Sequence, residues 1–131
     1  MSGLTDKVVV VTGAARGTGR THCERFADEG ADVIALDVAE AADDLAETAR
    51  AVRAHGRRCV TAPADVRDYD ALDAAITRGV SVLGRLDIVV ANAGIHAQGA
   101  PTWEITEEAW QRTLDVNLTG AWHTVKASVT R

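Results

Sequence analysis

Apolar residues along this chain fall into two recurring patterns. Short runs rich in β-branched side chains alternate with longer stretches in which apolar residues have helical spacing. The run at 8–12 contains four consecutive valines, so it predicts a strand that is buried on both faces. Together the two patterns predict strands at 8–12, 32–37, 59–62 and 86–91, and helices at 17–29, 42–55, 68–83 and from Thr106 onward.

This regular alternation of strands and helices predicts a parallel sheet covered by helices on both faces. Right-handed crossovers then give a doubly wound α/β fold of the Rossmann type, with its strands in the order 3-2-1-4. In such sheets, ligands bind in the crevice between strands 1 and 4, beyond the carboxyl ends of the strands.

The last predicted helix has two unusual features. Its residues Trp110, Leu114, Leu118 and Trp122 form an apolar row with a spacing of four, and no Gly, Asn or Pro ends the helical pattern before Arg131. The fourth strand would also remain a long hydrophobic edge, which soluble proteins normally cover. We therefore expect a fold cut after the fourth strand and the following helix, and a homo-oligomer formed through these apolar surfaces.

Composition and charge narrow the class of protein. With 131 residues, of which 47% are hydrophobic and 25% charged, the sequence is typical of one folded globular domain. The net charge of −5, without a basic cluster interleaved with aromatic residues, argues against a nucleic-acid partner. No apolar run approaches the roughly 20 residues that span a bilayer, and the N-terminus lacks the order of a signal peptide. We expect a cytoplasmic protein with no membrane contact.

Cysteine and histidine residues show no metal-binding pattern. Cys23 and Cys59 are too few and too scattered for a disulfide framework or a CxxC site, so we expect two buried thiols. The four histidines share no spacing typical of metal ligands. We therefore expect no metal.

Three glycines separate the first strand from the first helix. Gly13, Gly17 and Gly19 have the spacing GxxxGxG, and the loop lacks the GKS or GKT of a P-loop. In this setting, glycines allow a tight turn, a close approach of the backbone to a pyrophosphate, and close packing of helix and strand. The start of the helix then offers amides to the phosphates. The pattern indicates a dinucleotide cradle, with a plain turn as the alternative.

Asp37 strengthens the interpretation of the glycine loop as a cofactor site. It ends the second strand, 18 residues after Gly19, where a carboxylate can accept hydrogen bonds from an adenosine ribose. The same charge would repel a 2′-phosphate, and Val38 and Ala39 supply no base, although Arg16 in the loop is a nearby cation. We therefore predict NAD rather than NADP. A solvated strand end or a helix cap is the alternative role for Asp37.

Four short motifs follow one another along the chain. TGAARGTG at 12–19, ADV at 64–66, ANAG at 91–94 and VN at 116–117 occur in this order, with strand-length spacing between them. Together they resemble the classical branch of the short-chain dehydrogenase/reductase family. The resemblance covers the whole chain but only the first half or so of such a protein. Residues 1–131 would then be the NAD-binding Rossmann part, with the C-terminal half absent.

The resemblance implies roles for further residues. Asp65 would bond the adenine amino group and the Val66 backbone would meet the ring, while Asn92 would tie strands together beside the cofactor. Asn117 would be the active-site asparagine, whose backbone carbonyl holds a water in a proton relay. The expected cofactor-binding residues are Gly13, Arg16, Gly17, Thr18, Gly19, Asp37, Val38, Asp65, Val66, Asn92, Ala93, Gly94 and Val116. Considered locally, Asp65 could be an N-cap or turn aspartate, residues 92–94 could form a plain turn, and Asn117 could be a surface helix residue.

A narrower likeness involves longer segments. RGTGRTH, DDLAETARAVRAHGRR and LDIVVANAGI are similar to the mycofactocin-coupled subgroup of the family, which includes carveol-type dehydrogenases. This likeness implies a secondary alcohol substrate and a tightly held NAD. The segment after Asp37, VAEAADDL, is shorter than the loop of that subgroup, which argues against tight retention.

Hydride transfer from an alcohol also needs a base for the hydroxyl proton. In this family a tyrosine serves, with a lysine four residues later that lowers its pKa, and a serine orients the substrate. The one tyrosine here, Tyr69, has Asp73 at that spacing, so Asn117 is the only expected catalytic residue in the chain. We expect a parent enzyme that interconverts a secondary alcohol and a ketone, and a 131-residue chain that is inactive alone. A non-catalytic nucleotide-binding module or an inactive truncation product is the alternative.

Overall fold

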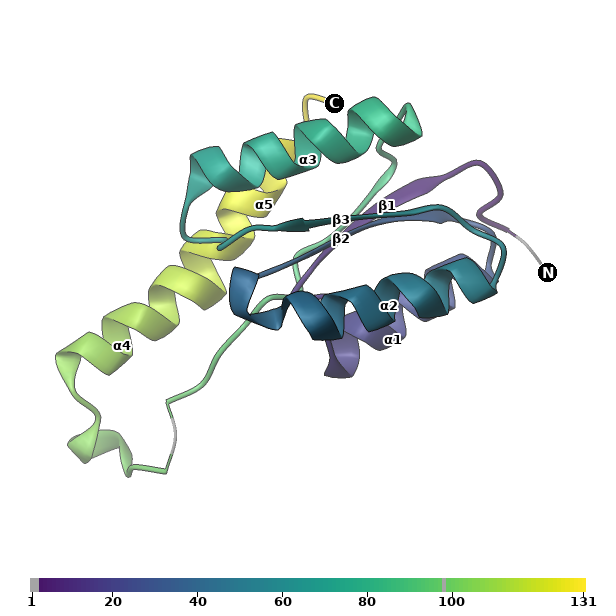
Figure 1. Cartoon of the computed structure of the whole chain (residues 1–131). Helices are drawn as coiled ribbons and strands as arrows, with labels where there is room; N and C mark the ends of the chain where they lie inside the picture. Colours follow the sequence, from purple (N-terminus) through teal and green to yellow (C-terminus); the bar gives the residue numbers. More distant parts are fainter. Residues whose placement is uncertain (1–2, 98) are drawn as a thin grey trace.

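The structure is a computed structural model that describes residues 3–97 and 99–131. Its sheet contains the parallel strands β1 (Val8–Thr12), β2 (Asp32–Asp37), β3 (Cys59–Pro63) and β4 (Ile88–Val90). The strands lie in the order β3-β2-β1-β4, which confirms the predicted order 3-2-1-4. Helices lie on both faces of the sheet, so the doubly wound Rossmann-type fold is confirmed as well (Figure 1).

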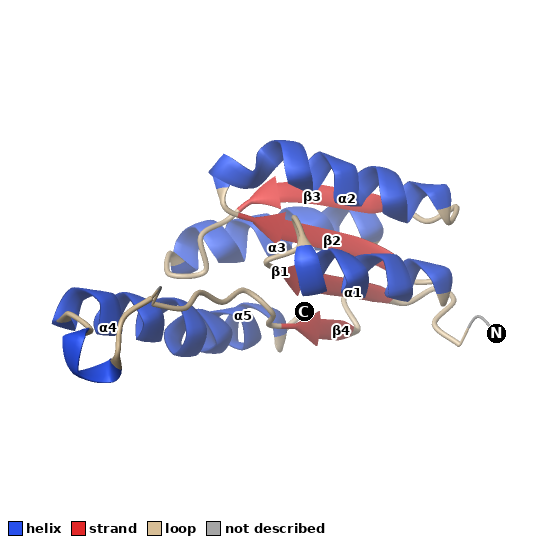
Figure 2. Cartoon of the chain, turned by 90° about the horizontal axis from the view of Figure 1, so that it is seen from below, coloured by secondary structure: helices blue, strands red, loops and turns tan. Residues whose placement is uncertain are grey.

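The helices form two layers, one on each face of the sheet (Figures 1 and 2). The helices α1 (Gly17–Asp28) and α2 (Ala42–Ala54) cover one face, and α3 (Tyr69–Leu83) and α5 (Gly120–Ser128) cover the other.

The valines of β1 explain why both faces need a cover. Val9 and Val11 belong to the apolar cluster beneath α1 and α2, whereas Val8 and Val10 belong to the cluster beneath α3. Every residue of β1 is at most 1% exposed, as predicted for a strand buried on both faces.

β4 is shorter than predicted. The sequence predicts a strand at 86–91, but the paired strand is Ile88–Val90. Side-chain hydrogen bonds join the neighbouring strand at both of its ends, beside one backbone bond from the Asp87 N–H to the Val8 carbonyl. The Asp87 carboxylate accepts the Val8 N–H at 2.9 Å, and the Asn92 side-chain amide donates to the Thr12 carbonyl at 3.1 Å. The other three strands and the first three helices end within one residue of their predicted ends.

The predicted helix after Thr106 is divided into three parts. α4 (Glu107–Leu114) begins at the predicted N-cap, where Thr106 Oγ1 accepts the Ala109 N–H at 3.2 Å. A π-helical turn at Asp115–Thr119 then leads into α5. α4 extends beyond the sheet, while α5 lies beside α3 (Figure 1). Single 3₁₀ turns occupy Ala39–Ala41 and Thr102–Glu104.

The apolar row of this last helical segment does not enter the core of the sheet. Trp110, Leu118 and Trp122 are 60%, 66% and 57% exposed. The buried side of α5 consists of the small residues Gly120, Thr124, Ala127 and Ser128. The exposed apolar residues of the row therefore lie on α4, the π-helical turn and α5. Within residues 3–97 and 99–131, no helix is long and apolar enough to cross a membrane.

Both cysteines are buried and unpaired, as predicted. Burial raises the pKa of Cys23 to about 12 and that of Cys59 to about 11. Because the thiolate is the reactive form, these protonated thiols are structural residues of the core. In the part of the chain that the structure describes, no group of three or more His, Cys, Asp or Glu side chains could hold a metal ion.

Candidate functional site

A cavity of about 470 Å³ lies at the carboxyl ends of the strands. Its walls come from the glycine loop after β1, the end of β2, the segment after β3, the segment after β4, and the α4 region. The lining residues are Gly13, Arg16, Thr18, Gly19, Asp37, Val38, Ala64, Asp65, Val66, Arg67, Asn92, Ala93, Gly94, Ile95, Arg112 and Val116. The structure thus brings together every predicted cofactor residue except Gly17, at the position where doubly wound sheets bind ligands.

The glycines of the loop meet different needs. Gly13 has a φ of +63°, and a Cβ there would lie 2.9 Å from Ala93 Cα. A Cβ on Gly19 would lie 1.9 Å from the Gly13 carbonyl oxygen, so α1 packs directly on the loop. Gly17 also has a positive φ, +55°, but open space surrounds its α-carbon. Close packing therefore requires Gly13 and Gly19, whereas backbone conformation alone requires Gly17.

The start of α1 is open to a ligand. Its N-cap residue, Arg16, has an extended backbone and makes no side-chain hydrogen bond that caps the helix. The first amides of an α-helix have no carbonyl partner within the helix, and the helix dipole makes this end electropositive. With Thr18 and Gly19 on the cavity wall, this end of α1 can bind an anionic group such as a phosphate.

The Asp37 carboxylate is fixed at the wall of the same cavity. Its Oδ2 accepts the Ala15 N–H at 2.9 Å, and its Oδ1 accepts the Val38 N–H at 2.8 Å. Each oxygen keeps a further lone pair, so the group can still accept hydrogen bonds from a vicinal diol. The alternative of a plain solvated strand end does not account for the bond to the glycine loop.

Asp65 has a partner that the sequence analysis did not include. Arg67 donates from Nε to both carboxylate oxygens, at 3.0 and 3.1 Å, and from Nη2 to Oδ2 at 2.5 Å. These bonds hold the pKa of Asp65 below its usual range. The Arg67 backbone N–H also donates to Oδ1 at 3.0 Å, so Asp65 closes a local turn. An adenine amino group would share an oxygen that Arg67 already uses.

The segment after β3 is held in place by α5. His123 Nδ1 lies 2.8 Å from the Val66 carbonyl oxygen, and it donates there because a carbonyl only accepts. Gly120 permits this approach, since a Cβ at that position would lie 2.4 Å from Val66 Cγ2. Contacts with α5, whose His123 lies 57 residues further along the chain, therefore hold Val66 at the cavity wall.

Asn92 joins the ends of β1 and β4. Its side-chain amide donates to the carbonyls of Thr12 and Gly13, at 3.1 and 3.2 Å. In return, Thr12 Oγ1 accepts the backbone N–H groups of Asn92 and Ala93, both at 3.1 Å. The predicted role of Asn92 in tying strands together therefore has a direct geometric basis.

Asn117 lies in the π-helical turn and contacts the segment after β4. Its Oδ1 accepts the Ile95 N–H at 2.8 Å, and its Nδ2 donates to the Ile95 carbonyl at 2.7 Å. Asn117 is exposed, and this paired contact ties the π-helical turn to the segment after β4. Asn117 is not among the residues of the cavity wall, and its catalytic role stays a prediction.

Tyr69 lies away from the cavity wall. It begins α3, where Lys126 Nζ lies 4.4 Å from the centre of its ring and His123 makes an edge contact at 5.5 Å.

Four cavity residues were missed by the sequence analysis: Ala64, Arg67, Ile95 and Arg112. Arg67 could have been found, because a basic residue two positions after Asp65 is close enough to pair with its carboxylate. Arg112 had none, because the placement of α4 alone brings it to the cavity.

Known proteins share this arrangement. The family profile described as short chain dehydrogenase matches residues 7–131. The chain belongs to the short-chain dehydrogenase family. This membership confirms the resemblance that the four sequence motifs indicated.

Several short-chain dehydrogenases are close relatives. The (−)-trans-carveol dehydrogenase of Rhodococcus erythropolis is 45% identical over 98% of this chain, and the match covers 50% of that enzyme. The cis-4-hydroxycyclohexanecarboxylate dehydrogenase of Sinomonas cyclohexanicum is 44% identical over 89% of this chain and 46% of its own length. The chain spans about half the length of the curated relatives it matches, and that half is their N-terminal half.

Solved structures of the family superpose closely. A carveol dehydrogenase from Mycobacterium avium in complex with NAD has a TM-score of 0.93 and 48% identity, over 99% of this chain and 50% of its own. A short-chain dehydrogenase from Mycobacterium paratuberculosis bound to NAD has a TM-score of 0.92 and 46% identity, over 98% of this chain and 51% of its own.

Proposed function

We propose that this chain binds NAD and forms the NAD-binding half of a short-chain dehydrogenase that interconverts a secondary alcohol and a ketone. The observation that carries the proposal is the Asp37 carboxylate, which is fixed by the glycine loop at the wall of the cavity. A carboxylate there accepts hydrogen bonds from the adenosine ribose and repels the 2′-phosphate of NADP. The NAD bound in the two similar structures from Mycobacterium avium and Mycobacterium paratuberculosis supports the same cofactor.

The proposed pose follows the residues of the cavity. The pyrophosphate would lie at the N-terminus of α1, the ribose against Asp37, and the adenine beside Asp65 and Val66. The nicotinamide end would lie along residues 92–94, toward Val116. When bound, NAD would accept a hydride from the carbon of an alcohol. This chain supplies the pocket, the contact with the ribose and the segment after β4 that Asn117 holds through Ile95.

The substrate class rests on chemistry that two relatives share. The names of two relatives, from Rhodococcus erythropolis and Sinomonas cyclohexanicum, give carveol and cis-4-hydroxycyclohexanecarboxylate as their substrates. Both compounds are secondary alcohols on a six-membered ring. We propose a secondary alcohol of this class for the whole protein. We also expect the 131 residues alone to be inactive, because their one tyrosine lies outside the cavity wall and is not followed by lysine at a spacing of four.

The first test compares the affinities for NADH and NADPH. We expect the chain to prefer NADH and Asp37→Ala to narrow this preference by about tenfold, the effect of one charge-assisted hydrogen bond. Fluorescence of the bound reduced nucleotide gives both dissociation constants. Asp43→Ala, in the first turn of α2, removes the same charge outside the cavity wall and serves as the control. An unchanged ratio for Asp37→Ala would refute the ribose assignment.

A nucleotide-binding module without hydride transfer is the second candidate. The observation in its favour is Tyr69, whose ring packs against His123 and Lys126 and which is not among the residues of the cavity wall. The two candidates differ in turnover. NADH formation from cyclic secondary alcohols by the protein purified from its own source supports the dehydrogenase, whereas NADH binding without turnover supports the module.

A further inference from the structure

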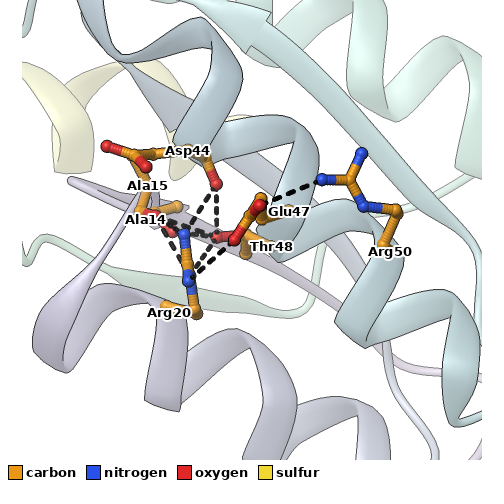
Figure 3. Close-up of polar contacts among 7 residues, drawn as sticks. All are labelled: Ala14, Ala15, Arg20, Asp44, Glu47, Thr48 and Arg50. Carbon is orange, nitrogen blue, oxygen red and sulfur yellow. Dashed lines mark hydrogen bonds and ion pairs between the residues drawn. The ribbon is translucent and has the colours of Figure 1, made fainter.

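A polar cluster joins the glycine loop to α2 (Figure 3). At its centre is Arg20, a residue of α1 whose side chain is 27% exposed. Its Nε donates to the Ala15 carbonyl at 3.1 Å, and its Nη2 donates to the same carbonyl at 2.7 Å. The same nitrogens reach α2, at Thr48 Oγ1 (3.1 Å) and the Asp44 carbonyl (2.9 Å). Arg20 thus joins α1, the loop and α2.

Thr48 completes the cluster from α2. It is fully buried, and its hydroxyl lies 2.8 Å from the Ala14 carbonyl oxygen. A hydroxyl has one proton to donate, and Ala14 is its nearest acceptor, closer than Ala15 at 3.2 Å or Asp44 at 3.4 Å. The Thr48 oxygen still accepts from Arg20. Arg20 and Thr48 therefore bond to the loop carbonyls and to each other.

The backbone N–H and C=O groups of both alanines before Arg16 are therefore all hydrogen-bonded. The Ala14 N–H donates to the Leu36 carbonyl at 3.0 Å, and the Ala15 N–H donates to Asp37. Their carbonyls are held by Thr48 and Arg20 on the α2 side. Neither alanine is among the residues of the cavity wall. A carbonyl oxygen that turned into the cavity would place negative charge where a phosphate has to bind.

We propose that Arg20 and Thr48, here called the loop clamp, are positioning residues for the pyrophosphate of the dinucleotide. They hold the Ala14 and Ala15 carbonyls against α2, which leaves the amides at the start of α1 facing the ligand. The proposal rests on the proposed function. It assigns to α2, which contributes no residue to the cavity wall, a part in cofactor affinity.

The ion pair within the cluster is secondary. Arg20 Nη1 lies 3.6 Å from Glu47 Oε2, which is longer than its contacts with the carbonyls. Glu47 is 57% exposed and also pairs with the exposed Arg50 at 3.3 Å. Arg50 therefore shares a partner with Arg20 but has no contact with the loop in Figure 3. Arg50→Met is thus a matched control for Arg20→Met.

The test measures the affinities of the full 131-residue chain for NADH, for ADP-ribose and for adenosine. Each variant is assayed at least 15 degrees below its own unfolding midpoint. We expect Arg20→Met to raise the dissociation constants of NADH and ADP-ribose by about tenfold, as for the loss of a charge-assisted hydrogen bond. Adenosine lacks the phosphates, and Asp37 keeps its bond to Val38, so adenosine affinity should change less than about twofold.

Three further variants of Arg20 and Thr48, with two control variants, define the mechanism. Thr48→Val removes only the hydroxyl and should follow Arg20→Met, while Thr48→Ser keeps it and should bind as the unmodified chain does. Arg20→Lys retains one cationic donor without the guanidinium fork and should recover part of the loss. Arg50→Met and Glu47→Gln should bind NADH within about twofold of the unmodified chain, because neither touches the loop carbonyls.

The outcomes separate this proposal from the proposed function. Unchanged NADH affinity in both Arg20→Met and Thr48→Val would overturn the clamp while NAD binding stands. An equal loss for ADP-ribose and adenosine would also overturn it, because a smaller folded fraction weakens all ligands alike. An unmodified chain that binds neither NADH nor ADP-ribose would overturn the proposed function, and the clamp with it.

Discussion

The Asp87 side chain fixes the first residue of the central strand. Its Oδ2 accepts the Val8 N–H at 2.9 Å, and Arg85 donates to both of its oxygens, at 2.8 and 2.6 Å. Lys7 adds a longer ion pair at 3.5 Å. The Arg85 hydrogen bonds lower the pKa of Asp87 to about 2. One carboxylate therefore connects the starts of β1 and β4.

This carboxylate gives the protein a defined sensitivity to acid. Because the folded pKa lies below the usual 3.8, its stabilising contribution is complete above about pH 4 and is lost as the pH falls toward 2. We expect Asp87→Asn to lower the free energy of unfolding at pH 7 by about 1 kcal/mol and to flatten its decline between pH 4 and 2. Urea denaturation at a series of pH values measures both effects.

Asp28→Asn is the matched control for this measurement. Asp28 is 53% exposed and pairs with Arg25 of the same helix, so its loss should change stability by about 0.5 kcal/mol or less. Equal losses for the two variants, or an unchanged acid profile in Asp87→Asn, would contradict the role given to Asp87.

Among the elements, the junction of β1 and α1 sets the strictest steric limits. A Cβ on Gly19 would meet a backbone oxygen at 1.9 Å, whereas a Cβ on Gly17 would meet nothing within 4 Å. Gly17→Ala should cost about 1 kcal/mol, the penalty of a left-handed conformation. Gly19→Ala should cost more than about 3 kcal/mol or prevent folding, since backbone atoms cannot move aside. Urea unfolding of the two variants tests this order, and equal losses would show that packing is not the difference.

The sequence predicted the elements well where one pattern sufficed. Four valines predicted a strand buried on both faces, and Thr106 with two glutamates predicted the start of α4. It failed where side-chain hydrogen bonds contribute to the pairing, as at both ends of β4. The π-helical turn at Asp115–Thr119 was also missed, because an apolar spacing of four fits an uninterrupted helix equally well.

The same contrast holds for the candidate site. The glycine spacing and Asp37 were recognisable because the chemistry of a dinucleotide requires them locally. Arg20, Arg67 and Arg112 were not predicted, because their importance depends on neighbours that the fold brings to them. A long basic side chain is compatible with many surroundings, so its residue type alone carries little information.

For the whole molecule, the exposed apolar row on α4 and α5 is the feature with the largest consequence. Trp110, Leu118 and Trp122 are all more than half exposed, and soluble proteins normally cover large apolar surfaces. We expect the chain to associate through this row. Trp110→Lys should shift light scattering toward the monomer, whereas Trp103→Lys, at a more exposed tryptophan on a separate 3₁₀ turn, should not. A monodisperse monomer of the unmodified chain would contradict the expectation.

The order of the strands also has a consequence for how the cavity is assembled. Val9 pairs with Val33 across one helix, but it pairs with Ile88 only after 79 residues have been brought back to the sheet. Because longer loops lose more entropy on closure, β1, α1 and β2 can form before β4 arrives. We therefore expect the glycine loop and Asp37 to come together early in folding, and the wall at Asn92–Gly94 to come last. During refolding, the binding site for the adenosine end of the ligand should therefore form before the binding site for the nicotinamide end.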